Sequence, residues 1–89
     1  MKYKLEMTKK AKDDFFILER KIQIRIAEKL RFYISLDNPL INAKKLVNTS
    51  VGMYRFRVGD YRIIFDIDNK GNIIVLLILR IKHRKDVYL

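Results

Sequence analysis

Three arginines occupy one nine-residue stretch, YRFRVGDYR, that has the pattern of a β-hairpin. Arg55 and Arg57 alternate with apolar residues before the Gly59-Asp60 pair, and Arg62 follows it. Like charges that face each other across a sheet are destabilising. The rigid guanidinium fork, however, suits bidentate contacts with phosphate. The stretch therefore suggests a phosphate site, and a solvated outer face of the sheet is the ordinary alternative.

Further groups capable of chemistry lie in the C-terminal stretch RIKHRKDVYL. His83 is the only histidine, and its unperturbed pKa is nearest to physiological pH. Tyr88 has an ordinary pKa of about 10 and is neutral unless neighbouring cations lower that value. Beside a basic face these residues would supply titratable groups to an anion site. A polar surface histidine and a packing tyrosine are the alternatives.

The overall charge points to an anionic partner. Twenty Lys and Arg against ten Asp and Glu give the 89 residues a net charge of +10. Such an excess attracts nucleic acid, an anionic membrane surface or an acidic protein. The chain has no cysteine and one histidine, which excludes thiolate and His-rich metal sites, so we expect no metal and no cofactor.

Neither secretion nor membrane insertion is expected. The N-terminus lacks the apolar run of a signal peptide. The longest apolar run, Ile73 to Leu79, is far too short to span a bilayer. We therefore expect a soluble, cytoplasmic protein with no membrane partner.

The N-terminal half must supply a strand and helices. Lys2 to Met7 alternates apolar and polar residues as a short strand does, and Thr8 is a suitable helix N-cap. Helical spacing of apolar residues then continues to Ile34. This is either one long helix or, with a break near Arg20, an αα-hairpin. Asp37-Asn38-Pro39 ends it, and a mostly polar connection from residue 40 to residue 50 follows.

The C-terminal half must supply the sheet. Strand-like runs cover Tyr54 to Val58, Tyr61 to Ile67 and Ile73 to Lys82. Gly59-Asp60 and the five-residue segment from Asp68 to Asn72 are the expected turns. The order is β-α-α-β-β-β. We predict a single α+β domain over residues 1–89, with a helical hairpin on one face of a small, largely antiparallel four-stranded sheet.

Register predicts which side chains share a face. If Gly59-Asp60 is a two-residue loop, Arg57 faces Arg62, and the aromatic residues of the hairpin lie on the helix side. Placing Ile67 opposite Ile73 then sets Arg62 opposite Ile78. Arg80 and Lys82 join the arginine side, beside an apolar floor of Ile64, Leu76 and Ile78. Only Asp60 and Asp66 are expected nearby to offset these cations.

The two motifs together resemble the RelE/ParE superfamily of bacterial and archaeal toxins. Its usual hairpin signature, Y-R-x-R-x-G-x-Y-R-I-x-Y, is matched from Tyr54 onward, with Phe65 in place of the final tyrosine. Its closing H-R-x-x-V-Y is matched from His83 to Tyr88. The resemblance spans the chain and includes the N-terminal strand and the α-hairpin. The fold that it implies agrees with the one derived above.

The resemblance implies a ribosome-dependent endoribonuclease that cuts mRNA and is neutralised by a RelB-like, net acidic antitoxin. In that reaction a base deprotonates a ribose 2′-hydroxyl, cations stabilise the pentavalent phosphate and an acid protonates the leaving 5′-oxygen. By position, the catalytic candidates are Arg62, Lys82, His83 and Tyr88. The candidates for binding RNA phosphates are Arg55, Arg57, Arg80, Arg84, Lys44 and Lys45. Which residue is the base stays open.

Two other functions remain open at this point. Much of the hairpin signature is shared with ParE-type toxins, which inhibit DNA gyrase and cleave nothing. A basic module that only binds RNA or protein is the third reading. The combination of Arg62, His83 and Tyr88 favours the nuclease.

Overall fold

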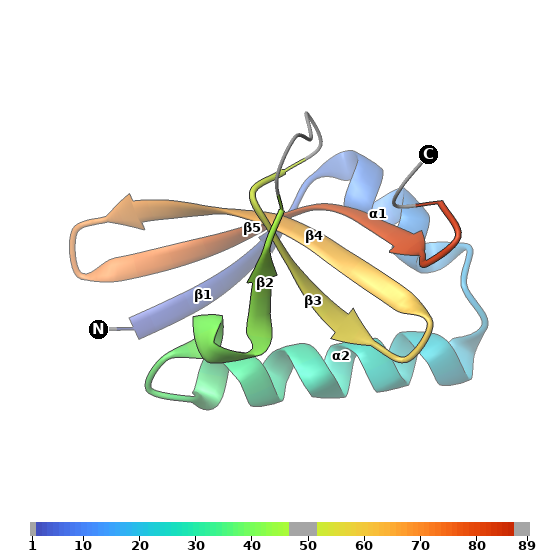
Figure 1. Cartoon of the computed structure of the whole chain (residues 1–89), viewed down its shortest axis with the longest axis horizontal. Helices are drawn as coiled ribbons and strands as arrows, with labels where there is room; N and C mark the ends of the chain where they lie inside the picture. The colour runs from blue at the N-terminus through green and yellow to red at the C-terminus, as the bar shows by residue number, and fades with distance from the viewer. Residues whose placement is uncertain (1, 47–51, 87–89) are drawn as a thin grey trace.

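The computed structural model describes residues 2–46 and 52–86, and its architecture is α+β, as predicted. Its elements follow in the order β1 (Lys2–Met7), α1 (Lys9–Phe16), α2 (Arg20–Ser35), η1 (Pro39–Asn42), β2 (Ala43–Lys45), β3 (Tyr54–Val58), β4 (Tyr61–Lys70) and β5 (Ile73–His83) (Figure 1). The helical pattern therefore divides near Arg20, giving two helices. No helix in the described part of the chain is long and apolar enough to cross a membrane.

Across the described residues the sheet has five strands in the order β1-β5-β4-β3-β2, one more than predicted. β1 runs parallel to β5, and the other neighbours are antiparallel. The additional strand is β2, which comes from the mostly polar connection after the helices and pairs with β3. Three residues are too few to show an alternating pattern, so only the pairing partner reveals this strand.

The β3–β4 hairpin has the predicted register. Val58 lies opposite Tyr61, and Arg57 lies opposite Arg62. Gly59 has a φ of 58°, in the left-handed region that a two-residue hairpin loop requires.

The β4–β5 hairpin corrects the prediction. β4 continues to Lys70, and Gly71-Asn72 forms a two-residue loop in which Gly71 has a φ of 73°. Lys70 therefore lies opposite Ile73, and Arg62 lies opposite Lys82 and not Ile78. The polar residues after Ile67 resemble a turn in sequence. At the exposed end of the hairpin, however, a strand needs no apolar side chains.

The pairing of β4 with β5 shifts by one residue between Ile64 and Phe65, where β5 has a bulge. On one side of it Phe65 pairs with Ile78, and on the other Ile64 pairs with Arg80, which leaves Leu79 as the extra residue. Leu76 and Ile78 consequently face the helices. Their predicted place on the arginine face is wrong, whereas Ile64 does lie there.

α2 covers the face of the sheet opposite the arginines, as expected (Figure 1). Its buried residues Ile26, Leu30 and Tyr33 pack against the hairpin. The rings of Tyr33 and Phe56 stack with centroids 4.4 Å apart, and Phe56 and Phe65 stack at 4.5 Å. This core fixes which side of the β3–β4 hairpin faces outward.

α1 covers an edge of the sheet. β1 pairs with β5 only as far as Ile78, so the edge of β5 away from β4 has no strand beside it from there on. Thr8 takes over at this point: its N–H donates to the Ile78 carbonyl at 3.0 Å and its hydroxyl to the Leu79 carbonyl at 3.1 Å. The same hydroxyl accepts from Ala11 N–H at 3.1 Å, which confirms the predicted N-cap. The exposed edge of β5 is thus closed by α1.

Candidate phosphate-binding face

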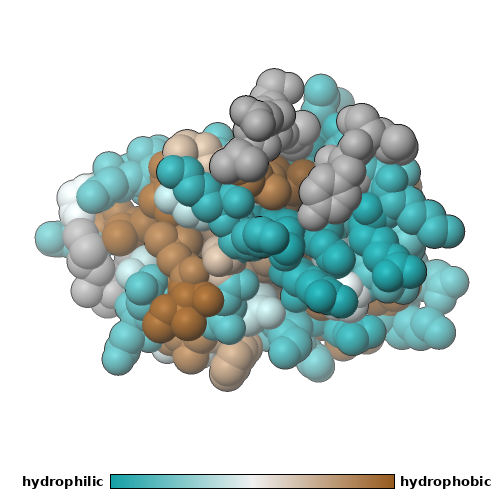
Figure 2. Space-filling model, viewed as in Figure 1, coloured by the Kyte–Doolittle hydropathy of each residue, from teal (hydrophilic) through white to brown (hydrophobic). Residues whose placement is uncertain are grey.

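Apart from Lys4 and Lys70 near the β4–β5 turn, six cationic residues lie on the sheet face opposite α2, because directly paired residues point to the same side. We call this set the cationic face; it consists of Lys44, Arg55, Arg57, Arg62, Arg80 and Lys82. The predicted gathering of the arginines and Lys82 on one face is confirmed. Figure 2 shows hydrophilic side chains gathered where β3 and β4 lie, and hydrophobic ones where β1 and η1 lie.

The cationic face consists of two rows that cross the strands. One row is Arg57, Arg62 and Lys82, on β3, β4 and β5. The other is Lys44, Arg55, Ile64 and Arg80, on β2 to β5. The first row is made entirely of cations. Such neighbouring like charges repel each other, and an anion lying against the row would offset that repulsion.

Arg62 is at the centre of the first row, and its guanidinium is held by its own hairpin. Nη1 donates to the carbonyls of Gly59 at 3.0 Å and Tyr61 at 3.2 Å. Arg62 is 8% exposed, and within the described residues it is the only buried charged residue. The local turn therefore fixes one end of the guanidinium before any ligand binds.

The neighbours of Arg62 are more accessible. Arg57 is exposed and Lys82 is half-buried. Arg55 is also half-buried, and its Nε is a buried donor with no hydrogen bond in the described part of the structure. Lys44 is exposed beside it on β2. The face thus combines one fixed arginine with accessible cations around it.

Arg80 forms an ion pair with a carboxylate from another element of the fold. Its Nε and Nη2 donate to the two carboxylate oxygens of Asp14 on α1, at 2.8 and 3.1 Å. The same carboxylate accepts from Ile81 N–H at 2.9 Å. Burial raises the pKa of Asp14, but the hydrogen bonds from Arg80 and Ile81 and the charges of Arg80 and Lys82 lower it more, so the pKa falls below its usual 3.8. The hydrogen bond to Asp14 in turn raises the pKa of Arg80.

His83 lies on the other side of the sheet from the cationic face. It pairs with Tyr61, whose ring it meets edge-on at a centroid distance of 5.4 Å. Its Nδ1 accepts from Lys85 N–H at 3.2 Å. The structure therefore does not place His83 beside Arg62.

Three further candidates are not among the six. Lys45 pairs with Tyr54 and so lies on the helix side of the sheet. Arg84 follows β5, and its Nε is 3.7 Å from the Asp60 carboxylate, with both side chains exposed. Tyr88 lies outside the described residues.

Asp14 was not among the acids expected near the arginines. One sequence signal could have drawn attention to it. α1 begins with lysines and carries Asp13 and Asp14 in its last turn, the reverse of what the helix dipole favours. Charges placed against the dipole indicate that another contact holds them. For Asp14 that contact is Arg80 and the edge of β5.

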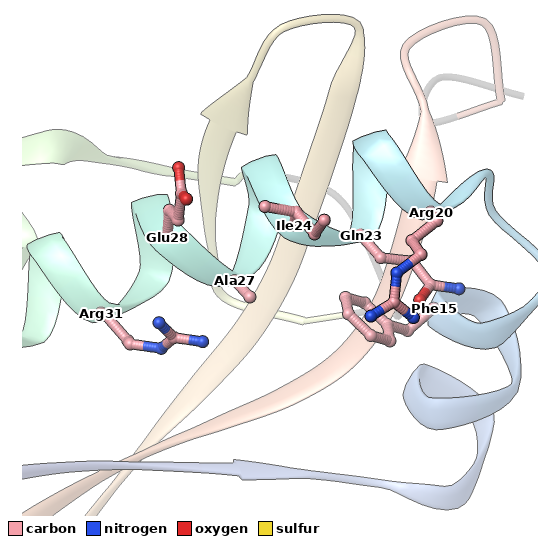
Figure 3. Close-up of a pocket in the computed structure, with 7 residues that line it drawn as sticks. All are labelled: Phe15, Arg20, Gln23, Ile24, Ala27, Glu28 and Arg31. Carbon is pink, nitrogen blue, oxygen red and sulfur yellow. The ribbon is translucent and has the colours of Figure 1, made fainter.

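A separate hollow lies between α1 and α2 (Figure 3). It is open, with a volume of about 190 Å³, and its lining includes Phe15 and Arg20 at one end and Arg31 at the other. These residues come from the helices and are separate from the cationic face. The described residues that line the hollow do not include a nucleophile beside a base.

The groups on the cationic face are suited to holding and stabilising negative charge. Within the described residues, acidic and histidine side chains nowhere gather in groups of three that could hold a metal ion. Closely spaced arginine and lysine side chains can bind adjacent phosphates, and can stabilise extra charge that develops on one of them.

Comparison with known proteins agrees with the motifs. A family model described as the ParE toxin of type II toxin–antitoxin system, parDE, matches residues 5–88. No curated protein matches. Among solved structures, the chain is similar to the toxin–antitoxin complex RelBE2 from Mycobacterium tuberculosis, with 28% identity, a TM-score of 0.70, and coverage of 94% of this chain and 100% of that chain.

The archaeal RelE–RelB complex from Pyrococcus horikoshii OT3 is also similar, with 25% identity and a TM-score of 0.68. That likeness covers 98% of this chain and 100% of the other. The predicted relationship to RelE and ParE toxins is confirmed. The chain belongs to the ParE toxin family of type II toxin–antitoxin systems, within the RelE/ParE superfamily.

Proposed function

We propose that this toxin is a RelE-like endoribonuclease that cuts mRNA on the ribosome and so inhibits translation. The observation that carries the proposal is the row of Arg57, Arg62 and Lys82, three cations side by side with the central guanidinium fixed by the turn. A phosphate would offset the mutual repulsion of this row. With a phosphate it becomes a ready electrostatic stabiliser.

In the proposed reaction a ribose 2′-oxygen loses its proton to a base and attacks the adjacent phosphorus. The bond from phosphorus to the 5′-oxygen breaks, and an acid protonates that oxygen, which leaves a cyclic phosphate and a 5′-hydroxyl. Arg62 and Lys82 would stabilise the charge of the pentavalent phosphorus, and Arg57 and Arg55 would hold the strand. Tyr88, which matches the family motif, and Lys82, which lies opposite Arg62, are the candidates for proton transfer, whereas His83 points to the other side of the sheet.

The test is primer extension on mRNA from a translating ribosome system supplied with the purified toxin. Codon-positioned cuts are expected with the natural chain and are expected to disappear with Arg62→Ala. Tyr88→Phe tests the tyrosine in the same assay. Arg31→Ala, on the exposed side of α2, removes the same charge away from the cationic face and should cut normally. Intact mRNA at every toxin concentration would refute the nuclease.

The description of the matching family model favours a second candidate, inhibition of DNA gyrase by binding. In that case mRNA stays intact and gyrase supercoiling stops. Running both assays on one preparation decides between them. A protein that binds RNA but does neither would be a basic binding module.

We also propose that a net acidic antitoxin neutralises this chain. Two similar solved structures are complexes with RelB antitoxins, and the net charge of +10 favours an acidic partner. Expression of the toxin alone should slow growth, and co-expression of the protein encoded by the adjacent gene should restore it. Harmless expression at a high level would count against a toxin.

A further inference from the structure

The ion pair between Asp14 and Arg80 distinguishes Arg80 from Arg57 on the cationic face. Asp14 comes from α1, yet both of its carboxylate oxygens reach the guanidinium of Arg80. The side chains of Asp14 and Arg80 are 15% and 33% exposed. Charge-assisted bidentate contacts of this length are among the stronger hydrogen bonds in proteins.

This pairing has a cost for any anion that approaches Arg80. A phosphate would have to displace the Asp14 carboxylate, or approach a guanidinium whose charge that carboxylate already offsets. Arg57 lies on the same face, is exposed and has no such carboxylate in the described part of the structure. The two arginines should therefore contribute unequally to phosphate binding.

Asp14 is also held in place from the backbone side. It accepts from Ile81 N–H, at the edge of β5 that β1 leaves uncovered. Ile81 lies between Arg80 and Lys82, so this bond fixes the strand at the position from which Lys82 reaches the row. The Asp14 carboxylate therefore bonds to both the backbone of β5 and Arg80, and these bonds hold it beside Arg80.

We propose that Asp14 is a positioning residue that withholds Arg80 from RNA phosphates and so restricts RNA contact to the remaining cations of the face. The inference rests on the proposed function, because it concerns how the same face selects its contacts. If so, the RNA-binding part of the cationic face is narrower and is centred on Arg57, Arg62 and Lys82.

The test is the salt dependence of binding to a short, fluorescent, 2′-O-methylated single-stranded RNA, which cannot be cleaved by 2′-oxygen attack. For single strands the slope of log K against log salt changes by about 0.7 for each phosphate contact. Arg57→Ala should reduce the slope by about that amount, whereas Arg80→Ala should leave it unchanged. Asp14→Asn should increase it by about 0.7, and Asp14→Asn combined with Arg80→Ala should restore the natural value.

The asparagine at position 14 keeps an oxygen that can accept from Ile81 N–H, and a thermal melt checks that the variant folds. If it does not fold, the comparison of Arg80→Ala with Arg57→Ala still decides. Equal losses of slope in these two variants would overturn the inference and leave the RNA proposal standing. A slope that does not respond to Arg57→Ala or Arg62→Ala would overturn both.

NMR of the arginine Nε–H groups provides a readout that needs no RNA. The Arg80 Nε–H should exchange slowly with solvent in the natural chain and rapidly in Asp14→Asn. Rapid exchange in the natural chain would show that Asp14 does not hold Arg80, and would overturn the inference.

Discussion

Arg57 lies directly opposite Arg62 on neighbouring antiparallel strands, and Arg62 lies directly opposite Lys82 on the next strand. Cross-strand neighbours of like charge lower stability. The stacked rings beneath them hold the strands in this register regardless, because shifting the hairpin by one residue would expose Phe56 and bury the arginines. Core packing therefore imposes the charge row.

Replacing Arg57 should separate stability from function. Arg57→Thr removes one charge from the row and puts a strand-favouring residue in its place. We expect the free energy of unfolding to rise by about 0.2–1 kcal/mol and RNA binding to weaken. Urea denaturation measures the first effect. Arg57→Lys keeps the charge and should show no such gain, so equal stabilities of the two variants would contradict the repulsion.

Gly59 and Gly71 form a matched pair for testing the first hairpin turn. Both have a positive φ, of 58° and 73°, where an alanine costs about 1–2 kcal/mol. A Cβ on Gly59 would also lie 3.1–3.3 Å from the guanidinium of Arg25, whereas nothing lies within 4 Å of one on Gly71. Gly59→Ala should therefore lower the free energy of unfolding more than Gly71→Ala.

Arg25→Ala provides the control for this comparison. In a chain that carries Arg25→Ala, the loss of unfolding free energy caused by Gly59→Ala should fall to about that of Gly71→Ala. Chemical denaturation measures both losses. If the two glycine variants cost the same in the natural background, Arg25 does not crowd the turn.

Asp14 should make stability depend on pH in the acid range. Its pKa is lowered in the folded state, so its stabilisation is complete above the ordinary value of 3.8 and is lost as the pH falls through the lower, folded value. Asp14→Asn should cost about 1–3 kcal/mol at neutral pH. This difference should shrink as the pH falls below 3.8.

Urea denaturation across that pH range measures the effect. Asp13→Asn, an exposed neighbour on α1, reports the general effect of removing a negative charge from the helix. If the difference in unfolding free energy between the natural chain and Asp14→Asn stays constant down to the lowest pH, the pKa of Asp14 is not lowered.

The hydroxyl of Thr8 should stabilise the folded protein. That group caps α1 and donates to the Leu79 carbonyl beside the bulge. Thr8→Val keeps the size but removes both hydrogen bonds, and should lower the free energy of unfolding by about 1–2 kcal/mol. Thr8→Ser retains the hydroxyl and should cost less. Thermal or urea unfolding distinguishes them, and equal losses would show that the hydroxyl is not the cause.

Local patterns were sufficient where neighbours in sequence are also neighbours in space. The N-cap at Thr8, the division of the helices near Arg20 and the two-residue loop at Gly59-Asp60 were predicted, because each depends on a few consecutive residues. Prediction failed at the β4–β5 hairpin. There the polar residues after Ile67 resembled a turn, and one bulge at Ile64/Phe65 changed the faces of Leu76 and Ile78.

The sequence by itself determined the family and the charge row across β3 and β4, since the motif residues and the tight turn lie within one short stretch. Tertiary structure decided the rest. It brought Lys82 opposite Arg62, added Lys44 through β2, placed His83 on the other face and set Asp14 against Arg80. These relationships join residues up to 66 positions apart in the chain. They follow from how strands and helices pack around the core, which no local pattern records.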